Sequence, residues 1–164
     1  MQTAIPGAVI TVSDRASAGE YADRSGPLAS ELLAEYGVQA AVTIVADDPS
    51  EIRRQIRNAI KSGARVVLTT GGTGISPRDI TPEVTRDLLD IKLPGIIDEI
   101  RRRSAVSVPT AVLSRAAAGI AVFKHSAPAF VINAPGSTGG VRDTVAVVGP
   151  LLRHILDQLD GMDH

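Results

Sequence analysis

A glycine-rich run near the middle of the chain carries the strongest chemical signal in the sequence. Residues 69–82 read TTGGTGISPRDITP, so Gly71, Gly72 and Gly74 directly follow an apolar stretch typical of a buried strand. Glycine lets the backbone approach a ligand closely, and successive N–H groups can form an anion-binding nest. The run lacks the Gly-Lys-Ser/Thr of a P-loop, and Pro77 stands where a dinucleotide fingerprint needs its third glycine. We therefore expect a phosphate-binding loop of another kind, with a plain tight turn as the alternative.

Two aspartates are predicted to lie beside such a phosphate. Asp48, which precedes Pro49, is the natural N-cap of a helix, so Asp47 is the freer carboxylate. Asp79 follows the glycine-rich run, and both loops leave the carboxyl ends of predicted strands. Two carboxylates would repel a polyphosphate by about 4 kcal/mol per charge pair at roughly 4 Å and an effective dielectric of about 20. Mg²⁺ held by Asp47 and Asp79 would remove this repulsion, because Mg²⁺ bridges carboxylate and phosphate oxygens. The pair predicts a magnesium–nucleotide site.

Two further loops follow predicted strands. Pro135–Thr138 precedes a helix that Ser137 or Thr138 could cap, and a helix N-terminus favours an anion. A capped turn with flexible glycines is the alternative for this loop. Ser13 and Asp14 follow the first predicted strand, where they could contact a ligand or form a surface turn with a local ion pair.

Composition excludes several classes of protein. The 164 residues fit one domain spanning 1–164, at about 150 residues per domain. A net charge of -1 and an aromatic content of 2% leave neither the electrostatic footprint nor the stacking platform of a nucleic-acid partner. With no cysteine, thiol catalysis and Cys-ligated zinc are excluded, and His125, His154 and His164 lack the spacing of metal ligands. No Gly-x-Ser-x-Gly elbow of a serine hydrolase is present.

The sequence also predicts where the protein works. The first residues lack a basic stretch followed by an apolar run, and no apolar stretch approaches the roughly 20 residues that cross a bilayer. We therefore expect a cytoplasmic protein with no membrane partner.

The elements that must position these loops alternate between strands and helices. Alternation with short connections predicts an α/β fold, a three-layer sandwich with a mostly parallel, Rossmann-like sheet and one antiparallel strand. In such sheets ligands bind beyond the carboxyl ends of the strands. A helix cap at Thr81 and one continuous closing helix are part of this prediction. We expect strands at 8–12, 42–45, 65–70, 118–123 and 129–133, and helices at 27–36, 49–63, from 81, at 94–103 and at 140–159.

Six motifs occur in order through nearly the whole chain: Ser13-Asp14-Arg15-Ala16-Ser17, Asp23-Arg24-Ser25-Gly26-Pro27, the Asp47 loop, Thr70–Gly74 with Arg78–Pro82, Leu113-Ser114-Arg115 and Pro135-Gly136-Ser137. Together they resemble the MoaB/Mog family of molybdenum-cofactor biosynthesis proteins. The resemblance implies that family's α/β fold, a homotrimer and molybdopterin as ligand. It implies an adenylyltransferase, in which Mg²⁺ and ATP convert molybdopterin to adenylyl-molybdopterin with release of pyrophosphate. The enzyme that inserts molybdenum is a further implied partner.

The resemblance also assigns roles to residues. Asp47 and Asp79 match the family's two functionally important aspartates, which makes them the expected catalytic residues and the expected Mg²⁺ ligands. A molybdopterin-binding or carrier protein without turnover, and a nucleotide-sensing assembly module, remain as alternatives. The expected substrate-binding residues are Ser13, Asp14, Gly71, Gly72, Thr73, Gly74, Ser76, Pro135, Gly136 and Ser137.

Overall fold

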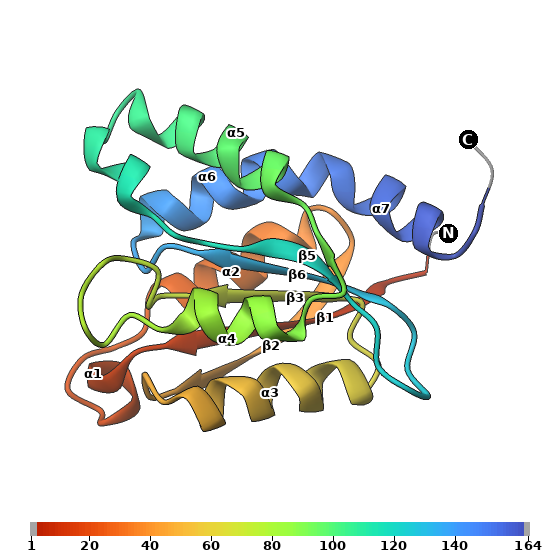
Figure 1. The fold of residues 1–164 in the computed structure, drawn as a ribbon, viewed down its shortest axis with the longest axis horizontal. Helices are drawn as coiled ribbons and strands as arrows, with labels where there is room; N and C mark the ends of the chain where they lie inside the picture. Colours follow the sequence, from red (N-terminus) through yellow and green to blue (C-terminus); the bar gives the residue numbers. More distant parts are fainter. Residues whose placement is uncertain (1–2, 163–164) are drawn as a thin grey trace.

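A six-stranded sheet lies between two layers of helices in the computed structural model, which describes residues 3–162 (Figure 1). The strand order is β2-β1-β3-β6-β5-β4. Both antiparallel pairings involve β5, which runs opposite to β6 and to β4. The predicted three-layer α/β sandwich with one antiparallel strand is therefore confirmed. The strands are β1 (Ile5–Val12), β2 (Val38–Val45), β3 (Val66–Thr70), β4 (Ile91–Lys92), β5 (Ala118–Ala121) and β6 (Ala129–Ala134).

Each face of the sheet packs against its own hydrophobic cluster. Four helices cover one face, and two helices cover the other (Figure 1). All five residues of β3 are buried, as expected for a central parallel strand covered on both sides. The first face carries α2 (Ser25–Ala34), α5 (Pro94–Ala105), α6 (Thr138–Val148) and α7 (Leu152–Leu159), and the second carries α3 (Pro49–Lys61) and α4 (Thr81–Leu88).

Helix α3 begins where the sequence predicts. The Asp48 carboxylate accepts a hydrogen bond from the Glu51 N–H at 3.0 Å, and Pro49 occupies the first turn. An aspartate cap and a first-turn proline both favour a helix start. The helix ends at Lys61, before Gly63, after burying three isoleucines spaced four residues apart. Asp48 is thus engaged as a cap, which leaves Asp47 available.

Two predictions about helices are wrong. The cap residue of α4 is Ile80, because Thr81 already has helical geometry and its side chain makes no cap hydrogen bond. The predicted closing helix over 140–159 is interrupted by the 3₁₀ turn η2 (Gly149–Leu151). Pro150 lies in this turn, and a proline removes a backbone donor and clashes with the preceding helical turn.

Smaller differences concern short segments. The residues after Ser13 form a short helix, α1 (Asp14–Ser17), which the Ser13 hydroxyl caps through the Ala16 N–H. β4 was not predicted, because two residues are too few to show a periodic pattern. None of the helices among residues 3–162 combines the length and apolar character that crossing a bilayer requires. His164, to which we assigned no metal role, lies outside the described residues.

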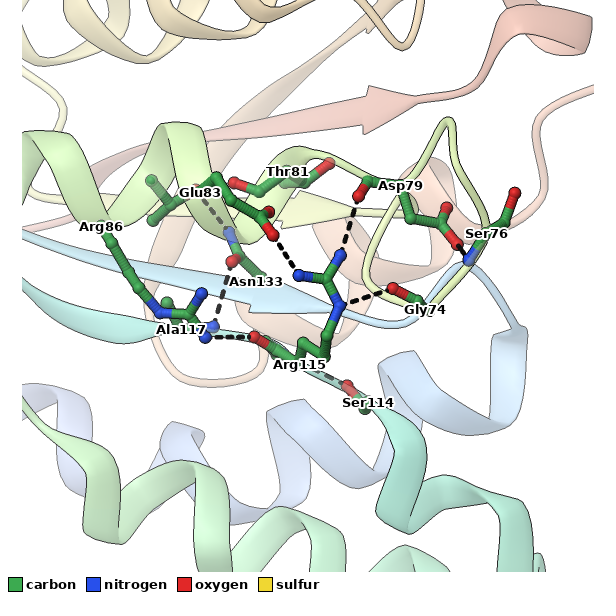
Figure 2. A network of polar contacts seen from close by, with 12 residues as sticks. Gly74, Ser76, Asp79, Thr81, Glu83, Arg86, Ser114, Arg115, Ala117 and Asn133 are labelled. Carbon is green, nitrogen blue, oxygen red and sulfur yellow. Dashed lines mark hydrogen bonds and ion pairs between the residues drawn. The ribbon is translucent and has the colours of Figure 1, made fainter.

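A buried amide joins the sheet to α4. The Asn133 side chain donates to the hydroxyls of Thr69 and Thr85 at 2.8 and 2.9 Å and accepts from the Ala117 N–H at 3.1 Å (Figure 2). Buried polar groups that lose their partner each cost about 1–3 kcal/mol. We expect Asn133→Leu to lower the free energy of unfolding by about 2–4 kcal/mol in urea denaturation, because Leu keeps the volume and removes all three bonds.

Thr81 offers a matched control for this prediction. Its buried Oγ1 has no hydrogen-bond partner among residues 3–162. Thr81→Val therefore breaks no bond, and we expect its unfolding free energy to stay within about 1 kcal/mol of wild type. Equal losses in the two variants would show that the Asn133 bonds contribute little.

Candidate active site at the carboxyl ends of the strands

Four loops leave the same edge of the sheet. The strand register pairs Thr11 with Thr70 and Thr70 with Ala134, and it pairs Val12 with Val45. The chain segments that follow these strand ends must therefore start side by side. All predicted site residues lie at this edge: Ser13 and the first residue of α1, Asp14, after β1, Asp47 after β2, Gly71–Asp79 after β3 and Pro135–Ser137 after β6.

The segment 71–79, here called the glycine loop, has two positions at which only glycine adopts the observed backbone without strain. Gly71 and Gly72 have φ angles of 105° and 68°. A Cβ at Gly71 would overlap the carbonyl oxygen of Val12, so the loop lies directly against the end of β1. Within residues 3–162, the N–H groups of Gly72–Ile75 donate to no other protein group. Successive unpaired N–H groups at a strand end are what a phosphate needs.

Two aspartates orient each other across neighbouring loops. The Asp14 N–H donates to Asp47 Oδ2 at 3.0 Å, and the Asp47 N–H donates to Asp14 Oδ1 at 2.9 Å. The Arg78 guanidinium donates to both oxygens of the Asp14 carboxylate at 2.8–3.0 Å. Both carboxylate oxygens of Asp14 thus accept hydrogen bonds, whereas no hydrogen bond to Asp47 Oδ1 is present within the described residues. The local ion pair considered for the Ser13–Arg15 turn is present between Arg15 and Glu20 at 3.5 Å, and Asp14 pairs in addition with Arg78, 64 residues away.

Asp79 approaches the same place from the glycine loop. Its Oδ2 accepts the Ser76 N–H at 3.0 Å, which closes a tight turn (Figure 2). Glycines face both carboxylates, because a Cβ at Gly72 would lie 3.1 Å from Asp47 Oδ1 and one at Gly74 would lie 2.9 Å from Asp79 Oδ2. The absence of side chains at these two positions leaves space beside each acid.

The electrostatics of the two acids differ. Burial raises the pKa of the Asp47 carboxyl, and the negative charges of Asp14 and Asp79 raise it further, against the opposing Asp14 N–H and Arg78. The hydrogen bond from Arg78 and that from the Asp47 N–H lower the pKa of Asp14. Asp47 therefore carries a charge that its surroundings do not fully compensate, which favours a cation at this acid.

The donor set fits a hydrated Mg²⁺. Asp47 and Asp79 each use one carboxylate oxygen in a backbone hydrogen bond and keep the other available. No cluster of three or more acidic or histidine side chains that could hold a metal occurs within residues 3–162. A cation bound here would therefore keep waters and phosphate oxygens among its ligands, as Mg²⁺ characteristically does.

The site opens into two cavities that share Ser137. A cavity of about 530 Å³ is lined by Ser13, Gly71, Gly136 and Ser137, together with Asp23 and Ser25 among other residues. A second of about 480 Å³ lies beside Thr73, Gly74, Pro135 and Ser137. Of the predicted site residues, Asp14, Asp47, Gly72, Ser76 and Asp79 line neither cavity. The two acids therefore lie outside the lining of both cavities, beside Gly72 and Gly74 of the glycine loop.

Sequence reasoning assigned no role to the residues that tie the loops together. The Thr11 hydroxyl donates to Asp23 Oδ2 at 2.6 Å, and Asp23 Oδ1 caps the Gly26 N–H at 3.0 Å. The Ser25 hydroxyl donates to the Gly136 carbonyl at 2.6 Å, and the Thr70 hydroxyl donates to the Pro135 carbonyl at 2.8 Å. The Asp-x-x-Gly-Pro spacing at the start of α2 could have indicated the Asp23 cap. The two bonds to the 135–137 loop join residues too far apart in sequence to leave a local pattern.

A titration tests the electrostatic coupling of the two acids. We expect Asp79→Asn to lower the pKa of the Asp47 carboxyl, because it removes a negative charge that raises it. The ¹³C chemical shift of the Asp47 carboxyl, followed between pH 3 and 8 by NMR, reports this pKa. In Asp48→Asn the same pKa should not move, since Asp48 does not contribute to it. An unchanged value in Asp79→Asn would mean that the acids lie too far apart to share a cation.

Comparison with known proteins places these loops in a family context. The family model described as "Probable molybdopterin binding domain" matches residues 8–154. A protein named molybdopterin adenylyltransferase, from Pyrococcus furiosus, is 42% identical over 149 residues, which cover 90% of this chain and 87% of that protein. The molybdenum cofactor biosynthesis bifunctional protein of Synechococcus elongatus is 43% identical over 157 residues, 95% of this chain. This chain spans 48% of that longer relative.

Solved structures share the fold over nearly the whole chain. The structure described as the tungsten cofactor synthesizing protein MoaB from Pyrococcus furiosus superposes with a TM-score of 0.89 and is 38% identical, covering 97% of this chain and 99% of that one. The structure of the molybdopterin biosynthesis Mog protein from Mycobacterium ulcerans gives a TM-score of 0.87 at 37% identity, covering 98% and 100%.

Proposed function

The chain belongs to the MoaB/Mog family of molybdopterin-binding domains, and from this membership and the geometry of the strand-end loops we propose that it is a molybdopterin adenylyltransferase. It acts in molybdenum-cofactor biosynthesis and uses ATP to convert molybdopterin to adenylyl-molybdopterin. The observation that carries the proposal is the glycine loop, whose unpaired N–H groups lie next to the Asp47 and Asp79 carboxylates. A phosphate-binding loop beside two acids suits phosphoryl chemistry better than simple pterin binding, which gives no reason for the acids.

The reaction needs positioning more than proton transfer. A terminal phosphate oxygen of molybdopterin attacks the α-phosphorus of ATP, a new P–O bond forms, and the bond to the bridging oxygen breaks as pyrophosphate leaves. The attacking oxygen is already anionic, so no strong general base is required. Alignment of two phosphates and neutralisation of their charge therefore dominate the rate acceleration.

The residues of the site divide this work. The N–H groups of Gly72, Thr73 and Gly74 orient a phosphate, and Ser76 or Ser137 adds a hydrogen bond. Gly71 lets the loop lie against β1, while Ser13 and Gly136 line the first cavity and Pro135 lines the second, between which the substrate is divided. Asp14 holds Asp47 in place through their paired hydrogen bonds. Asp47 and Asp79 would hold Mg²⁺, which screens the negative charge that the phosphates bring together.

The proposal extends to assembly and location. Residues 1–164 act as one molybdopterin-binding domain in the cytoplasm and form a homotrimer. Exposed apolar side chains around the 3₁₀ turn η1 (Pro109–Leu113) support contact with other copies, and they are Val106, Val108, Val112 and Leu113. The enzyme that inserts molybdenum is the proposed recipient of the product.

Pyrophosphate release tests the function directly. We expect the protein to release pyrophosphate from ATP when Mg²⁺ and freshly prepared molybdopterin are both present under anaerobic conditions, and not when either is omitted. Adenylyl-molybdopterin, identified by mass spectrometry, must accumulate in equal amount. Binding of molybdopterin without release would instead identify a carrier protein and would leave the two aspartates without their proposed role.

A further inference from the structure

Arg115 reaches from the segment before β5 into the glycine loop. Its Nε donates to the Gly74 carbonyl at 2.7 Å, and its Nη2 donates to the Asp79 carbonyl at 2.7 Å (Figure 2). The remaining terminal nitrogen, Nη1, pairs with the Glu83 carboxylate. The backbone N–H of Arg115 also donates, to the Thr73 carbonyl at 2.8 Å. One residue therefore holds three carbonyl groups of the loop between Thr73 and Asp79.

The segment that carries Arg115 is itself held from two sides. Arg86, on α4, donates to the Arg115 carbonyl at 2.8 Å (Figure 2). Arg101, on α5, donates to the Ser114 carbonyl at 2.8 Å. Helices from opposite faces of the sheet thus fix the backbone from which the Arg115 side chain extends, so the guanidinium has a rigid base.

These bonds determine which way the peptide groups of the loop point. A trans peptide unit is planar, and its C=O and N–H point in opposite directions. Because the carbonyls of Thr73 and Gly74 point to Arg115, the N–H groups of Gly74 and Ile75 point away from it. Those two N–H groups belong to the set that has no protein partner within residues 3–162. The hydrogen bonds from Arg115 to the loop carbonyls, here called the clamp, thus leave the N–H donors of Gly74 and Ile75 on the opposite side of the loop.

Arginine suits this task better than lysine. A planar guanidinium offers donors in a fixed fork, so a single side chain can hold two carbonyls and one carboxylate at the same time. Glu83 compensates the positive charge of Arg115, so the charge of the guanidinium does not itself recruit the phosphate. With its side chain only 31% exposed and every nitrogen engaged, Arg115 is placed to hold the loop and not the ligand.

We infer that Arg115 is a positioning residue that pre-organises the phosphate-binding loop, an inference that rests on the proposed function for its effect on turnover. Without the clamp the loop carbonyls are free to rotate, and the N–H groups no longer converge before the ligand arrives. A loop that must be ordered during binding has a lower apparent affinity for the ligand and a slower reaction.

The test compares Arg115→Gln with Arg65→Gln. Arg65 makes the same kinds of contact away from the glycine loop, since its Nε donates to the Pro128 carbonyl at 2.9 Å and its Nη2 pairs with Asp160 at 2.7 Å. Amide hydrogen exchange, followed residue by residue by NMR, reports the order of the loop without any substrate. In Arg115→Gln we expect exchange of the Ser76 and Asp79 amides, which are the hydrogen-bonded amides of residues 72–79, to rise at least about ten-fold while β3 and β6 keep wild-type protection. In Arg65→Gln we expect the loop to exchange as in wild type.

Kinetics and chemical rescue add two readouts. We expect Arg115→Gln to raise the KM for molybdopterin at least about ten-fold, and Arg65→Gln to change it less than about two-fold. Millimolar methylguanidinium should restore part of the loss in Arg115→Gln and none in an Asp79 variant, because it replaces only the missing donors. Should Arg115→Gln fail to fold, Arg115→Lys supports the same comparison, since it keeps the charge but cannot hold all three partners.

The outcomes separate this inference from the proposed function. Unchanged exchange of the Ser76 and Asp79 amides in Arg115→Gln or Arg115→Lys overturns the positioning role, whatever the activity. Equal effects of the Arg115 and Arg65 variants on exchange and KM also overturn it. If the wild type releases no pyrophosphate, the proposed function fails, but faster loop exchange in the Arg115 variant alone still supports the clamp.

Discussion

We expect Gly71→Ala to abolish most activity and to lower the free energy of unfolding by about 3–5 kcal/mol. Gly71 has a φ of 105°, and a Cβ there would overlap the carbonyl oxygen of Val12, which is backbone and cannot rotate aside. The loop must therefore move away from β1. Such a shift displaces the N–H groups that follow, so pyrophosphate release should fall at least about 100-fold. Urea denaturation and the pyrophosphate assay measure the two effects.

Gly63→Ala is a close control for this prediction. Gly63 has a φ of 107°, almost the angle of Gly71, but nothing lies within 4 Å of the position of its Cβ. Alanine at 63 therefore suffers the same backbone strain, about 1–2 kcal/mol, without a collision. We expect that variant to keep wild-type turnover. Similar losses in the two variants would mean that the contact with Val12 is unimportant and that backbone strain alone explains both.

Elements with a strong local pattern could be predicted from the sequence. The isoleucines of α3 repeat every four residues behind an Asp-Pro start, and β3 begins with three consecutive apolar residues, so both elements are read from a window of about a dozen residues. Of the two wrong helix predictions, the unbroken closing helix overlooked a local signal, Pro150, whereas the cap of α4 was misassigned from residue type alone. Thr81 has the residue type of a cap, but its N–H donates to the Gly72 carbonyl and its Oγ1 has no hydrogen-bond partner among residues 3–162, so it caps no N–H group of α4.

The same distinction applies to the site. Loops at the ends of parallel strands could be predicted to meet, because the topology places every such end at one edge. The partners of the loop residues could not be predicted from spacing, because they are distant in sequence. Arg78 binds Asp14 across 64 residues, and Arg115 binds the Gly74 carbonyl across 41. An arginine in a surface segment gives no local sign of a carbonyl that it will hold.

The site also shows how stability and function oppose each other at one carboxylate. Burial and two neighbouring negative charges raise the pKa of Asp47, so its charged form is less stable in the folded protein than in water. Because the pKa of Asp47 is raised in the folded state, this acid lowers the free energy of unfolding at neutral pH, where it is ionised. The unfavourable charge is what a cation would relieve. A carboxylate whose charge destabilises the folded protein, and which a bound cation would stabilise, is typical of a functional site.

Asp47→Asn should therefore make the protein more stable and less active. Asparagine keeps an oxygen that can accept the Asp14 N–H and removes the uncompensated charge. We expect pyrophosphate release to fall by about 100- to 1,000-fold, since a Mg²⁺ ligand is lost. The unfolding free energy should exceed that of wild type at pH 7. This gain must disappear as the pH falls below the unfolded-state value near 3.8, because wild-type Asp47 is then protonated in both states.

Asp48→Asn separates the role of Asp47 from the loss of any acid at this turn. Asparagine caps helices about as well as aspartate, so the bond to the Glu51 N–H survives and α3 still begins at Pro49. We expect that variant to keep wild-type turnover and its dependence on Mg²⁺ concentration. If Asp47→Asn lost stability at neutral pH and Asp48→Asn lost as much activity, the two acids would serve the fold of the turn. A gain in stability joined to a loss of turnover, in the Asp47 variant alone, requires that the charge of Asp47 be kept for catalysis.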